Sequence, residues 1–390
     1  MFWKPSASEE ADLEPFFQVT QVSIPKDFID LGLGDPQLAL LPQEVIRQAA
    51  QDRLSQNDPG FLQYGANQGD GFFRQSLAKF LGSGYGSPVE PDSLFITSGV
   101  SMGLHLLCSL FTRPGDPVFV EEPTYLYALR IFTDHDLRLV PIQTDEDGLV
   151  IESLEENLAH FRPKFLYIIP TFQNPSGQTL SQERREQVLN LSRKHGFIIA
   201  ADEVYHLLSY REAPPQPFAA YISAGNVISL GSFSKILAPG LRLGWIQASA
   251  EIIQRFINSG LLDSGGGLNP FTSAIVRTVL DTGGLEQNVA HLVSIYRTRL
   301  AAMDAALRRD LPGLRYRLPE GGYFIWAHLP QGLTAKDLQP SADAFKVGFR
   351  AGSLFSSRGG MQEYIRLCFV YYEVGELEQG IFRLKQALQK

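Results

Sequence analysis

One lysine of the chain stands where it could act as a nucleophile. Lys235 comes shortly after the apolar run Val227–Leu230, behind Ser232 and Ser234, in the stretch VISLGSFSKILAPGLRLGW. If that run is a strand of a parallel sheet, the lysine leaves the sheet at its carboxyl edge, where α/β proteins bind ligands. A lysine that is partly desolvated there and close to other cations can lose its proton and attack a carbonyl carbon.

The residues around this lysine are suited to bind a phosphate group. Ser232 and Ser234 offer hydroxyl groups, and Arg242, seven positions after Lys235, offers a fixed cation. Hydroxyls and a guanidinium group together match the hydrogen-bonding needs of a phosphate dianion. A string as short as S-x-S-K is also compatible with a surface lysine on a loop whose serines cap a helix. These residues alone therefore leave both interpretations open.

Such residues need an α/β scaffold, and the pattern of the chain predicts one. From about residue 50 to 280, short apolar runs alternate with amphipathic stretches, as in a mostly parallel sheet flanked by helices. The predicted strands are Leu94–Thr97, Val118–Glu121, Leu137–Ile142, Phe165–Ile169, Phe197–Ala201, Val227–Leu230 and Leu243–Gln247. The predicted helices are Ser101–Phe111, Tyr125–Thr133, Ile151–Phe161 and Gln182–His195, the last with Ser181 at its start.

The pattern changes after residue 284 and predicts a second, smaller lobe. Leu285–Arg309 has the spacing of one long helix. It is followed by strand-like runs at Leu314–Arg317, Tyr323–His328 and Tyr364–Val370, and by expected helices around Ala342–Ala351 and at Val374–Leu388. We therefore predict an N-terminal segment over 1–45 that completes the small lobe, a large domain over 46–284 and a small α+β domain over 285–390.

The composition excludes several classes of protein. The 390 residues carry 34 Lys and Arg against 42 Asp and Glu, a net charge of −8, which argues against a surface for nucleic acid or anionic lipid. Cys108 and Cys368 lie in apolar runs, so a disulfide framework and a zinc site are excluded, and the histidines show no metal-ligand spacing. No window reaches the roughly 20 apolar residues of a membrane helix, and the N-terminus lacks the pattern of a signal or transit peptide. We expect a cytoplasmic protein that acts on small molecules.

Several separated motifs occur together in the chain. They are YGANQGDGFFR, TSGVSMGLHLL, QNPSGQTLS, ADEVY, SFSKILAPGLRLG and GGYFIW, between LGLGDP near one end and YIRLCFV near the other. In order and approximate spacing this set resembles the fold-type I pyridoxal-phosphate enzymes, in particular the class I/II aminotransferases of the aminoadipate, kynurenine and valine–pyruvate branches. The resemblance implies pyridoxal 5'-phosphate as cofactor. It also implies transfer of an amino group from an α-amino acid to a 2-oxo acid by a ping-pong mechanism.

The resemblance assigns roles to residues at the centre of the site. Lys235 would bind the aldehyde of the cofactor and, once freed, move a proton between the substrate Cα and the cofactor's C4′. Asp202 would pair with the pyridine nitrogen, and Tyr205 and Asn174 with the phenolic oxygen of the ring. From the residues alone, Asp202 could also cap a helix and Asn174 could serve a turn.

Further positions match cofactor-binding residues of the family. Val100 and Ser101, at the start of a helix after Gly99, would add backbone N–H groups to the phosphate site, although such strand–helix joints often bind nothing. Tyr125 would stack on the cofactor ring, with an ordinary core aromatic as the alternative. Tyr64 would reach the phosphate from a second subunit, which implies at least a homodimer.

Other positions match substrate-binding residues of the family. Alternation places Arg366 on the same strand face as Cys368 and Val370, which is unusual for a solvated charge. The resemblance makes Arg366 a two-pronged clamp on the substrate α-carboxylate, with Asn174 in the same set and Gly34 as a backbone neighbour. An edge-strand surface arginine and a glycine that merely permits a tight turn are the alternatives.

The substrate side chain and the type of reaction are predicted less sharply. Phe16, Phe17 and Leu40–Leu41 suggest an apolar pocket for aromatic or aliphatic side chains, or equally core residues of the small lobe. A carbon–sulfur β-lyase could use the same residues. A non-catalytic sensor of the kind fused to DNA-binding domains is the third hypothesis, but the aminotransferase pattern starts near residue 30 and the chain is acidic. The glycines at Gly265–Gly267 suit either close backbone approach or a mobile loop.

Overall fold

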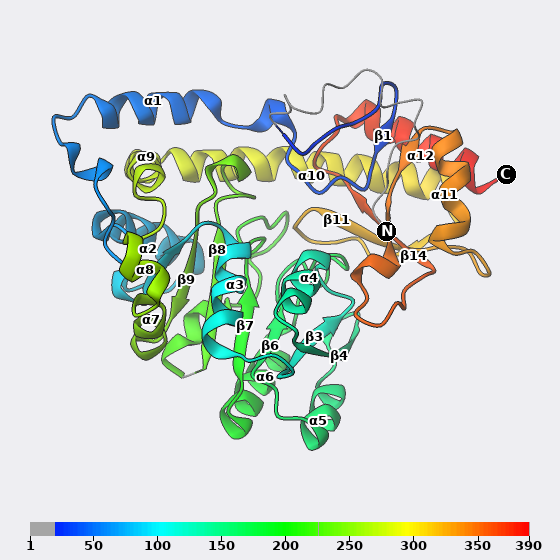
Figure 1. Cartoon of the computed structure of the whole chain (residues 1–390). Helices are drawn as coiled ribbons and strands as arrows, with labels where there is room; N and C mark the ends of the chain where they lie inside the picture. Colours follow the sequence, from blue (N-terminus) through cyan, green and yellow to red (C-terminus); the bar gives the residue numbers. More distant parts are fainter. Residues whose placement is uncertain (1–19, 225, 390) are drawn as a thin grey trace.

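One sheet of eight strands forms the centre of the large lobe (Figure 1). The computed structural model describes residues 20–224 and 226–389. The strands of this sheet are β2 (Leu94–Thr97), β3 (Pro117–Glu122), β4 (Arg138–Asp145), β5 (Gly148–Leu149), β6 (Phe165–Ile168), β7 (Ile198–Asp202), β8 (Val227–Ser232) and β9 (Gly244–Ala248). Their order in space is β2-β9-β8-β7-β6-β3-β4-β5. All the strands predicted for this lobe are confirmed, with shifts of a few residues at their ends.

The middle of this sheet is parallel and buried on both faces. The neighbours β8, β7, β6, β3 and β4 run in the same direction, whereas β9 and β5 are antiparallel to their neighbours. Successive residues of one strand pack into different apolar cores: Ala200 belongs to one and Ile199 to the other. This explains why the strands appear in the sequence as unbroken apolar runs rather than alternating ones.

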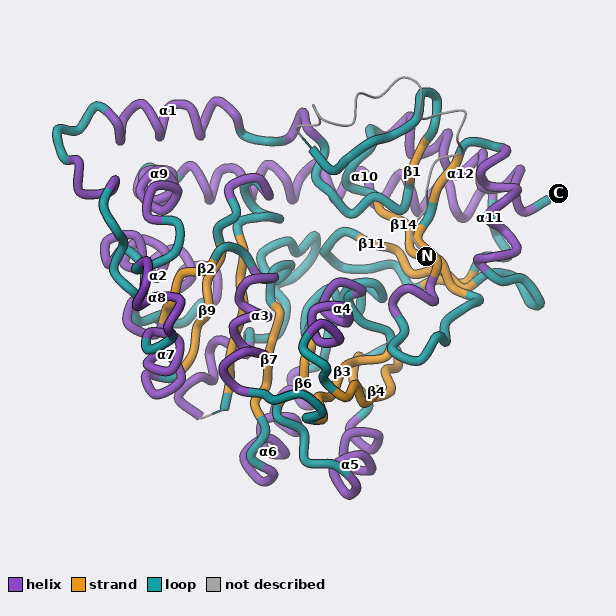
Figure 2. Tube along the Cα trace, in the orientation of Figure 1, coloured by secondary structure: helices purple, strands orange, loops and turns teal. Residues whose placement is uncertain are grey.

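Helices cover both faces of the sheet (Figure 2). The helices before residue 284 are α1 (Gln43–Leu54), which packs on α9 rather than on the sheet, and α2 (Gly71–Tyr85), α3 (Val100–Phe111), α4 (Leu126–Asp134), α5 (Ile151–His160), α6 (Gln182–His195), α7 (Ala250–Ile257), α8 (Gly260–Gly265) and α9 (Pro270–Asp281). Helix α6 begins as predicted, because the Ser181 side chain accepts a hydrogen bond from the backbone N–H of Arg184. Short 3-10 helices lie at Leu38–Leu40, Pro59–Leu62, Pro91–Ser93, Phe218–Ala224, Pro239–Leu241 and Gly352–Phe355.

The smaller lobe contains an antiparallel sheet and draws on both ends of the chain. Its elements are β1 (Ile29–Asp30), α10 (Gly284–Asp310), β10 (Arg315–Tyr316), β11 (Phe324–His328), α11 (Ala335–Ala344), β12 (Val347–Gly348), β13 (Arg350–Ala351), β14 (Tyr364–Cys368) and α12 (Val374–Leu388). The sheet has the order β10-β11-β14-β13, and β1 pairs in parallel with β12. The predicted fold class, a large α/β lobe with a smaller α+β lobe built from both chain ends, is confirmed.

The helix expected around Ala342–Ala351 is wrong. Helix α11 lies earlier, starts at a capping box between Thr334 and Asp337, and continues through Pro340. After Lys346, whose φ is 55°, the chain turns into β12 and β13. These short strands form because β1 and β14 are available as pairing partners, and such partners lie far away in the sequence.

Helix α10 joins the two lobes. It has 27 residues, runs below α1 in Figure 1, and packs against α9 near its start and α12 further along. In its second turn the side-chain amide of Asn288 donates to the carbonyl oxygen of Ile236 at 2.8 Å, so the helix holds the turn that carries Lys235. No helix in the described ranges has the length and apolar character that a bilayer crossing needs.

Candidate active site

Lys235 lies half-buried in the turn after β8, where it contacts the small lobe. Its Nζ donates to the carbonyl oxygen of Gly34 at 2.9 Å and lies 5.1 Å from the centre of the Tyr323 ring. The Tyr323 hydroxyl in turn donates to the Lys235 carbonyl oxygen at 3.1 Å. Burial lowers the pKa of the Lys235 ammonium, and the nearby Arg366 lowers it further, while Asp35 acts in the opposite direction. The amine is thus shifted towards its neutral, nucleophilic form.

Asp202 ends β7 with one carboxylate oxygen unpaired. The Tyr167 hydroxyl donates to Oδ2 at 2.8 Å, whereas Oδ1 has no hydrogen-bond partner among the described residues although the side chain is only 3% exposed. Burial raises the pKa of this carboxyl to about 6, against the lowering effect of Tyr167. A buried carboxylate oxygen without a donor is costly, so it indicates a missing cationic or N–H partner.

Three of the predicted phosphate-binding residues, Arg242, Val100 and Ser101, meet at the start of α3. Arg242, with φ 45°, is exposed, and its Nη2 lies 3.4 Å from the carbonyl oxygen of Ser98. A Cβ added to Gly99 would lie 3.2 Å from the same Nη2, so the guanidinium group covers the glycine that precedes Val100 and Ser101. In the described chain no side chain caps this helix. The helix start and the arginine therefore form a positive site for an anion.

The two serines of this edge form their own small network. Ser232 ends β8, and its Oγ donates to Ser234 Oγ at 2.9 Å and accepts from the Ser234 N–H at 3.1 Å. Asp202 lies at the same end of the neighbouring strand, because it pairs with Leu230 in the parallel register of β7 and β8. The structure thus brings the carboxylate, the serines and the lysine turn to one sheet edge, as the sequence predicts.

Two tyrosines lie near Asp202. Tyr125 is the residue that precedes α4, and burial, followed by the charge of Asp202, raises the pKa of its hydroxyl. Tyr205 is 3% exposed, and its ring centre lies 5.5 Å from that of Tyr323 and 6.1 Å from that of Phe324. Burial also raises the pKa of the Tyr205 hydroxyl, and Tyr125 and Asp202 raise it further. Both phenols are neutral hydrogen-bond donors at physiological pH.

Arg366, from β14, is held by both lobes. Its Nη1 donates to Asn174 Oδ1 at 2.9 Å and its Nη2 to the carbonyl oxygen of Gly32 at 2.8 Å. The guanidinium carbon lies 3.9 Å from the centre of the Phe324 ring and 4.9 Å from that of Phe355. The residue is 4% exposed, and burial lowers its pKa to about 10. It is therefore a desolvated charge facing the large lobe, and the surface-arginine alternative does not hold.

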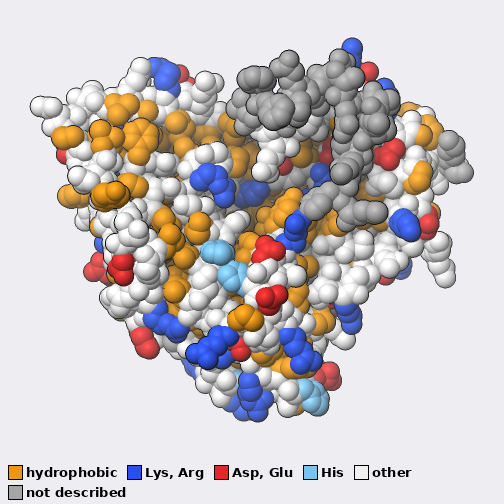
Figure 3. Space-filling model, viewed as in Figure 1, with side chains coloured by type: hydrophobic (Ala, Val, Ile, Leu, Met, Phe, Trp, Pro, Cys, Tyr) orange, Lys and Arg blue, Asp and Glu red, His pale blue; other side chains and the backbone are white. Residues whose placement is uncertain are grey.

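Gly34 lies against this arginine. A Cβ added to Gly34 would lie 3.3 Å from Phe324 Cζ and 3.4 Å from Arg366 Nη2. A side chain there would crowd the space in front of the guanidinium group, so the glycine does more than permit a turn. In the space-filling view, Lys and Arg side chains gather in a hollow between the lobes (Figure 3).

Comparison with known proteins places this geometry in a family. Residues 26–382 match the family described as aminotransferase class I and II. The chain belongs to this family. It is 34% identical to aromatic-amino-acid aminotransferase 1 of Thermococcus litoralis, over 93% of this chain and 88% of the relative. It is 33% identical to the 2-aminoadipate transaminase of Thermus thermophilus, over 91% and 89% of the two chains.

A solved structure gives the same picture for the fold. The kynurenine aminotransferase of Pyrococcus horikoshii, crystallised with PMP, superimposes with a TM-score of 0.88 at 33% identity, over 97% of this chain and 98% of that one. The protein is thus an aminotransferase of a pyridoxal-phosphate-dependent family. The unpaired Oδ1 of Asp202, the shifted pKa of Lys235 and the anion site at α3 fit that cofactor.

Sequence reasoning missed residues of the aminotransferase that touch these groups. Tyr167 is inside a buried strand and looks like an ordinary core aromatic, yet it is the donor to Asp202. Asp35 follows Gly34 directly and opposes the lowering of the Lys235 pKa. Phe355 packs on Arg366 from the end of the 3-10 helix Gly352–Phe355, a segment without a recognisable sequence motif. Of these, only Asp35 had a sequence signal, its place in the LGLGDP turn.

Tyr64 is the predicted site residue that lies apart from the others in this aminotransferase. It is 79% exposed. Its neighbour Gly65 pairs with Gly267 through an isolated bridge, and a Cβ on Gly267 would lie 1.9 Å from the carbonyl oxygen of Ala66. Of the two readings of the glycine-rich segment Gly265–Gly267, close backbone approach is the one that the structure supports.

The predicted apolar pocket is only partly described. Phe16 and Phe17 lie outside the described residues. Leu40 is half-buried and packs against the main core of the aminotransferase, which favours the core role for it, and Leu41 is also half-buried. Aromatic residues instead surround Arg366 and Tyr205, mainly Phe324, Phe355 and Tyr323.

Proposed function

We propose that this aminotransferase transfers the amino group of an α-amino acid with an aromatic, aliphatic or aminoadipate-like side chain to a 2-oxo acid by ping-pong chemistry at Lys235. The observation that carries the proposal is the pair formed by Lys235, with a lowered amine pKa, and Asp202, with an unpaired buried oxygen. Together they match the two ends of pyridoxal 5'-phosphate that need a protein partner, the aldehyde and the pyridine nitrogen.

The residues at the sheet edge would hold the cofactor. When bound, pyridoxal phosphate supplies an electron sink for charge that develops on the substrate Cα. Asp202 would keep a proton on the pyridine nitrogen through Oδ1, and Tyr205 and Asn174 would donate to the phenolic oxygen. Tyr125 would lie against the ring. Asn174 Oδ1 accepts from Arg366, which leaves the NH₂ group of Asn174 for such a role.

The phosphate would bind at the start of α3. Val100 and Ser101 would donate backbone N–H groups, and Ser232, Ser234 and Arg242 would complete the anion site. Arg242 already lies against Gly99, so this part of the site needs little rearrangement.

Arg366, Asn174 and Gly34 would bind the substrate. The α-carboxylate would take the guanidinium N–H group that now donates to the carbonyl oxygen of Gly32. Lys235, freed from Gly34, would then carry the proton to and from Cα as general base and acid. Phe324 and Phe355 would exclude water from the guanidinium group.

The substrate class rests on the aromatic surroundings of the site and on the named activities of the relatives. Those names are aromatic-amino-acid, 2-aminoadipate and kynurenine aminotransferase. Flat, apolar side chains would pack well near Phe324 and Tyr125, whose side chain is half-buried beside the exposed Tyr127.

We propose a homodimer in which Tyr64 reaches the phosphate of the partner subunit. Large apolar side chains are exposed on the elements that flank Tyr64 in the chain and on α9, which supports an interface on this part of the molecule. They belong to the 3-10 helix Pro59–Leu62, to α1 and α2 on either side of it in the chain, and to α9, which packs against all three. The residues are Leu54 at 55%, Leu62 at 67%, Phe72 at 65% and Phe271 at 44% exposed. We also retain the division into 1–45, 46–284 and 285–390 as a proposal.

Reduction with borohydride tests the proposal directly. Protein loaded with pyridoxal phosphate should carry a pyridoxyl group on the peptide that contains Lys235, and Lys235→Ala should lose at least about a thousandfold in turnover. Mixing with an aromatic amino acid should bleach the cofactor absorbance and release one oxo acid per site. Ammonia and pyruvate from cysteine-like substrates would instead identify a β-lyase, and an unlabelled Lys235 would refute the proposal.

A further inference from the structure

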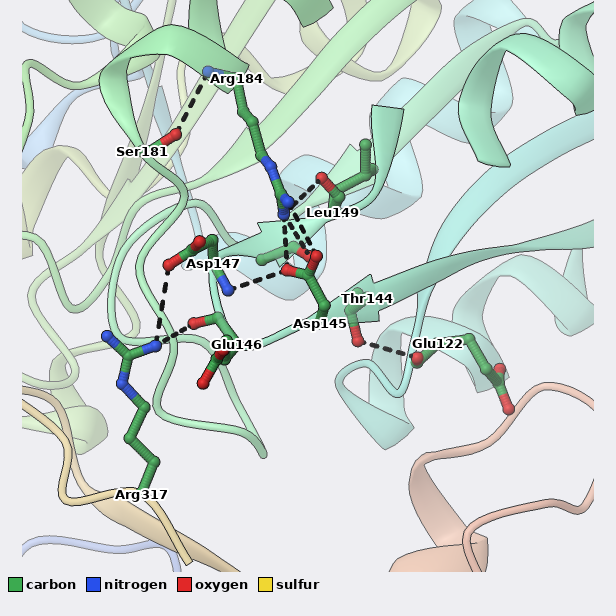
Figure 4. A network of polar contacts seen from close by, with 10 residues as sticks. Glu122, Thr144, Asp145, Glu146, Asp147, Leu149, Ser181, Arg184 and Arg317 are labelled. Carbon is green, nitrogen blue, oxygen red and sulfur yellow. Dashed lines mark hydrogen bonds and ion pairs between the residues drawn. The ribbon is translucent and has the colours of Figure 1, made fainter. Parts of the chain in front are cut away.

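A buried carboxylate of the large lobe is surrounded by donors from the small lobe. Glu122, the last residue of β3, is 2% exposed. Its Oε2 accepts from the N–H of Ser357 at 2.9 Å and from the Ser357 hydroxyl at 2.8 Å, and Oε1 accepts from the Ser356 hydroxyl. Figure 4 shows its side chain directed towards the orange-red ribbon of this small-lobe segment.

The next residues of the large lobe hold the same segment. The backbone N–H of Thr124 donates to the carbonyl oxygen of Phe355 at 2.9 Å. Ser356 also organises the segment itself, because its Oγ accepts from the N–H of Gly360 at 2.8 Å. Residues 355–360, which we call the Glu122-bound loop, are thus fastened to the end of β3 by backbone and side-chain contacts.

This fastening depends on neutral donors more than on an ion pair. The one cation near Glu122 in the described chain is Arg358, at 3.8 Å and with its side chain 62% exposed, so the ion pair contributes little. A buried carboxylate is costly unless its oxygens accept hydrogen bonds. Undocking of the loop would leave Glu122 without these donors, and this favours the docked position.

The Glu122-bound loop leads directly to the substrate-carboxylate site. Phe355 is fully buried, and its ring centre lies 4.9 Å from the guanidinium carbon of Arg366 and 5.7 Å from the centre of the Trp326 ring. Tyr125, which we propose to lie against the cofactor ring, follows Thr124 in the chain. The hydrogen bond between Thr124 and Phe355 therefore links this part of the cofactor site to the aromatic ring that covers Arg366. A shift of the loop would move Phe355 and admit water to Arg366.

We propose that Glu122 is a positioning residue for the α-carboxylate of the substrate: it fastens the Glu122-bound loop so that Phe355 covers the guanidinium group of Arg366. This rests on the proposed function, in which Arg366 binds that carboxylate. A desolvated guanidinium group binds a carboxylate more strongly than a hydrated one. Glu122 should therefore control how strongly the enzyme prefers an amino acid to the amine that lacks the carboxylate.

The test compares L-phenylalanine with 2-phenylethylamine in single-turnover reactions of the loaded protein. In Glu122→Gln one acceptor oxygen becomes an NH₂ group that faces the donors of Ser357 or Ser356, so the loop loosens. We expect the single-turnover specificity for phenylalanine, the maximal rate constant divided by the apparent dissociation constant, to fall between about tenfold and a hundredfold, mostly through a higher apparent dissociation constant. The rate with phenylethylamine should stay unchanged.

A matched control removes another carboxylate between the lobes. Asp147, from the turn after β4, lies 3.8 Å from Arg317 of the small lobe (Figure 4). Its side chain is 61% exposed, so this contact holds the lobes only weakly. Asp147→Asn should leave the ratio of the two substrates unchanged. Ser357→Ala removes the hydroxyl donor to Glu122 without introducing a second donor that faces it. It should therefore lower the specificity for phenylalanine in the same way as Glu122→Gln, but less. The double variant with Glu122→Gln should lose less than the product of the single losses.

Hydrogen exchange gives a readout that does not need turnover. In Glu122→Gln the amides of Ser357 and Gly360 should exchange faster than in the wild type, while those of β7 keep their protection. Equal losses with both substrates, or an unchanged ratio with unchanged exchange, would overturn the role of Glu122. A wild-type protein that reacts with neither substrate would refute the proposed function, and exchange would still decide whether Glu122 fastens the loop.

Discussion

The two ends of the candidate site are prepared differently for their ligands. At the sheet edge, Asp202 keeps a buried oxygen without a partner in the described chain. At the small lobe, both terminal nitrogens of Arg366 already donate to protein oxygens, those of Asn174 and Gly32. Asp202 gains a partner when the cofactor binds, whereas Arg366 must give up a protein hydrogen bond for each one that it makes to the substrate. Cofactor binding should thus be strong and lasting, and substrate binding weaker and readily reversed.

The largest expected effect concerns the unpaired carboxylate. Asp202→Asn keeps an acceptor for the Tyr167 hydroxyl but cannot carry the negative charge that retains a proton on the pyridine nitrogen. We expect the single-turnover rate with an amino acid to fall by about a hundredfold or more. Tyr167→Phe, which leaves the carboxylate in place, should have a much smaller effect. Equal losses in both variants would contradict the special role of the open oxygen.

Substitution of Arg366 tests the proposed replacement of its protein hydrogen bonds by the substrate carboxylate. Arg366→Lys cannot replace two N–H contacts held in a fixed plane, so kcat/KM for amino acids should fall about a hundredfold. The cofactor absorbance should stay the same. Arg350→Lys is the matched control, because Arg350 pairs with Arg366 across β13 and β14 but contacts Asp30. A comparable loss in that control would point to general damage of the small sheet.

The open carboxylate also predicts how cofactor binding depends on pH. With its pKa raised to about 6, Asp202 is protonated below that pH and loses the charge that attracts a protonated pyridine nitrogen. Affinity for pyridoxamine phosphate, which needs no free lysine amine, should be constant above about pH 7 and fall by up to about tenfold per unit below 6. Asp202→Asn should bind weakly and without this dependence. Titration by fluorescence between pH 5 and 8 measures both.

The raised pKa of Asp202 also determines how the stability of the folded protein changes with pH. An Asp whose pKa is higher in the folded than in the unfolded chain binds a proton more readily when folded, so its contribution to stability is lost as pH rises from about 4 to about 6. In the cofactor-free protein, Asp202→Asn should therefore raise the melting temperature at pH 7 relative to its effect at pH 4. Bound cofactor should remove this difference, because it supplies the missing partner.

The smallest effect on activity is expected for Asp30, which supports Gly32, the backbone acceptor of Arg366. Asp30 holds Arg350 at 3.1 Å and the N–H of Gly32 at 2.9 Å, and Gly32 in turn accepts from Arg366. Asp30→Asn should cost about 1–2 kcal/mol of unfolding free energy and raise KM a few fold, with kcat unchanged. Asp27→Asn, whose contact with Lys346 is exposed and 3.9 Å long, should change neither in urea unfolding or steady-state kinetics.

The two ends also differ in how far the sequence predicts them. Asp202, Ser232 and Lys235 follow consecutive buried strands, and the rule that parallel strands share one carboxyl edge brings them together. The surroundings of Arg366 come from residues 32, 174, 324 and 355, which only the packing of two lobes unites. Periodicity contains no information about such contacts, so Phe355 and Glu122 went unpredicted.

The small lobe shows the same limit for secondary structure. The strands β11 and β14 and the helix α12 have strong local patterns and were predicted. The helix expected at 342–351 failed because Val347–Gly348 and Arg350–Ala351 pair with β1 and β14, which lie far away in the chain. Tyr64 is a different case, since a residue proposed to act in a partner subunit has no contact within one chain that could test it.

The helix that joins the lobes has a consequence for how the protein unfolds. Helix α10 buries side chains along its whole length, and Asn288 ties it to the carbonyl of Ile236 beside the lysine. We therefore expect unfolding of the small lobe to disturb the turn that carries Lys235. Calorimetry should record a single cooperative transition for the whole molecule. Substitutions that destabilise the C-terminal half should also weaken the binding of pyridoxal phosphate.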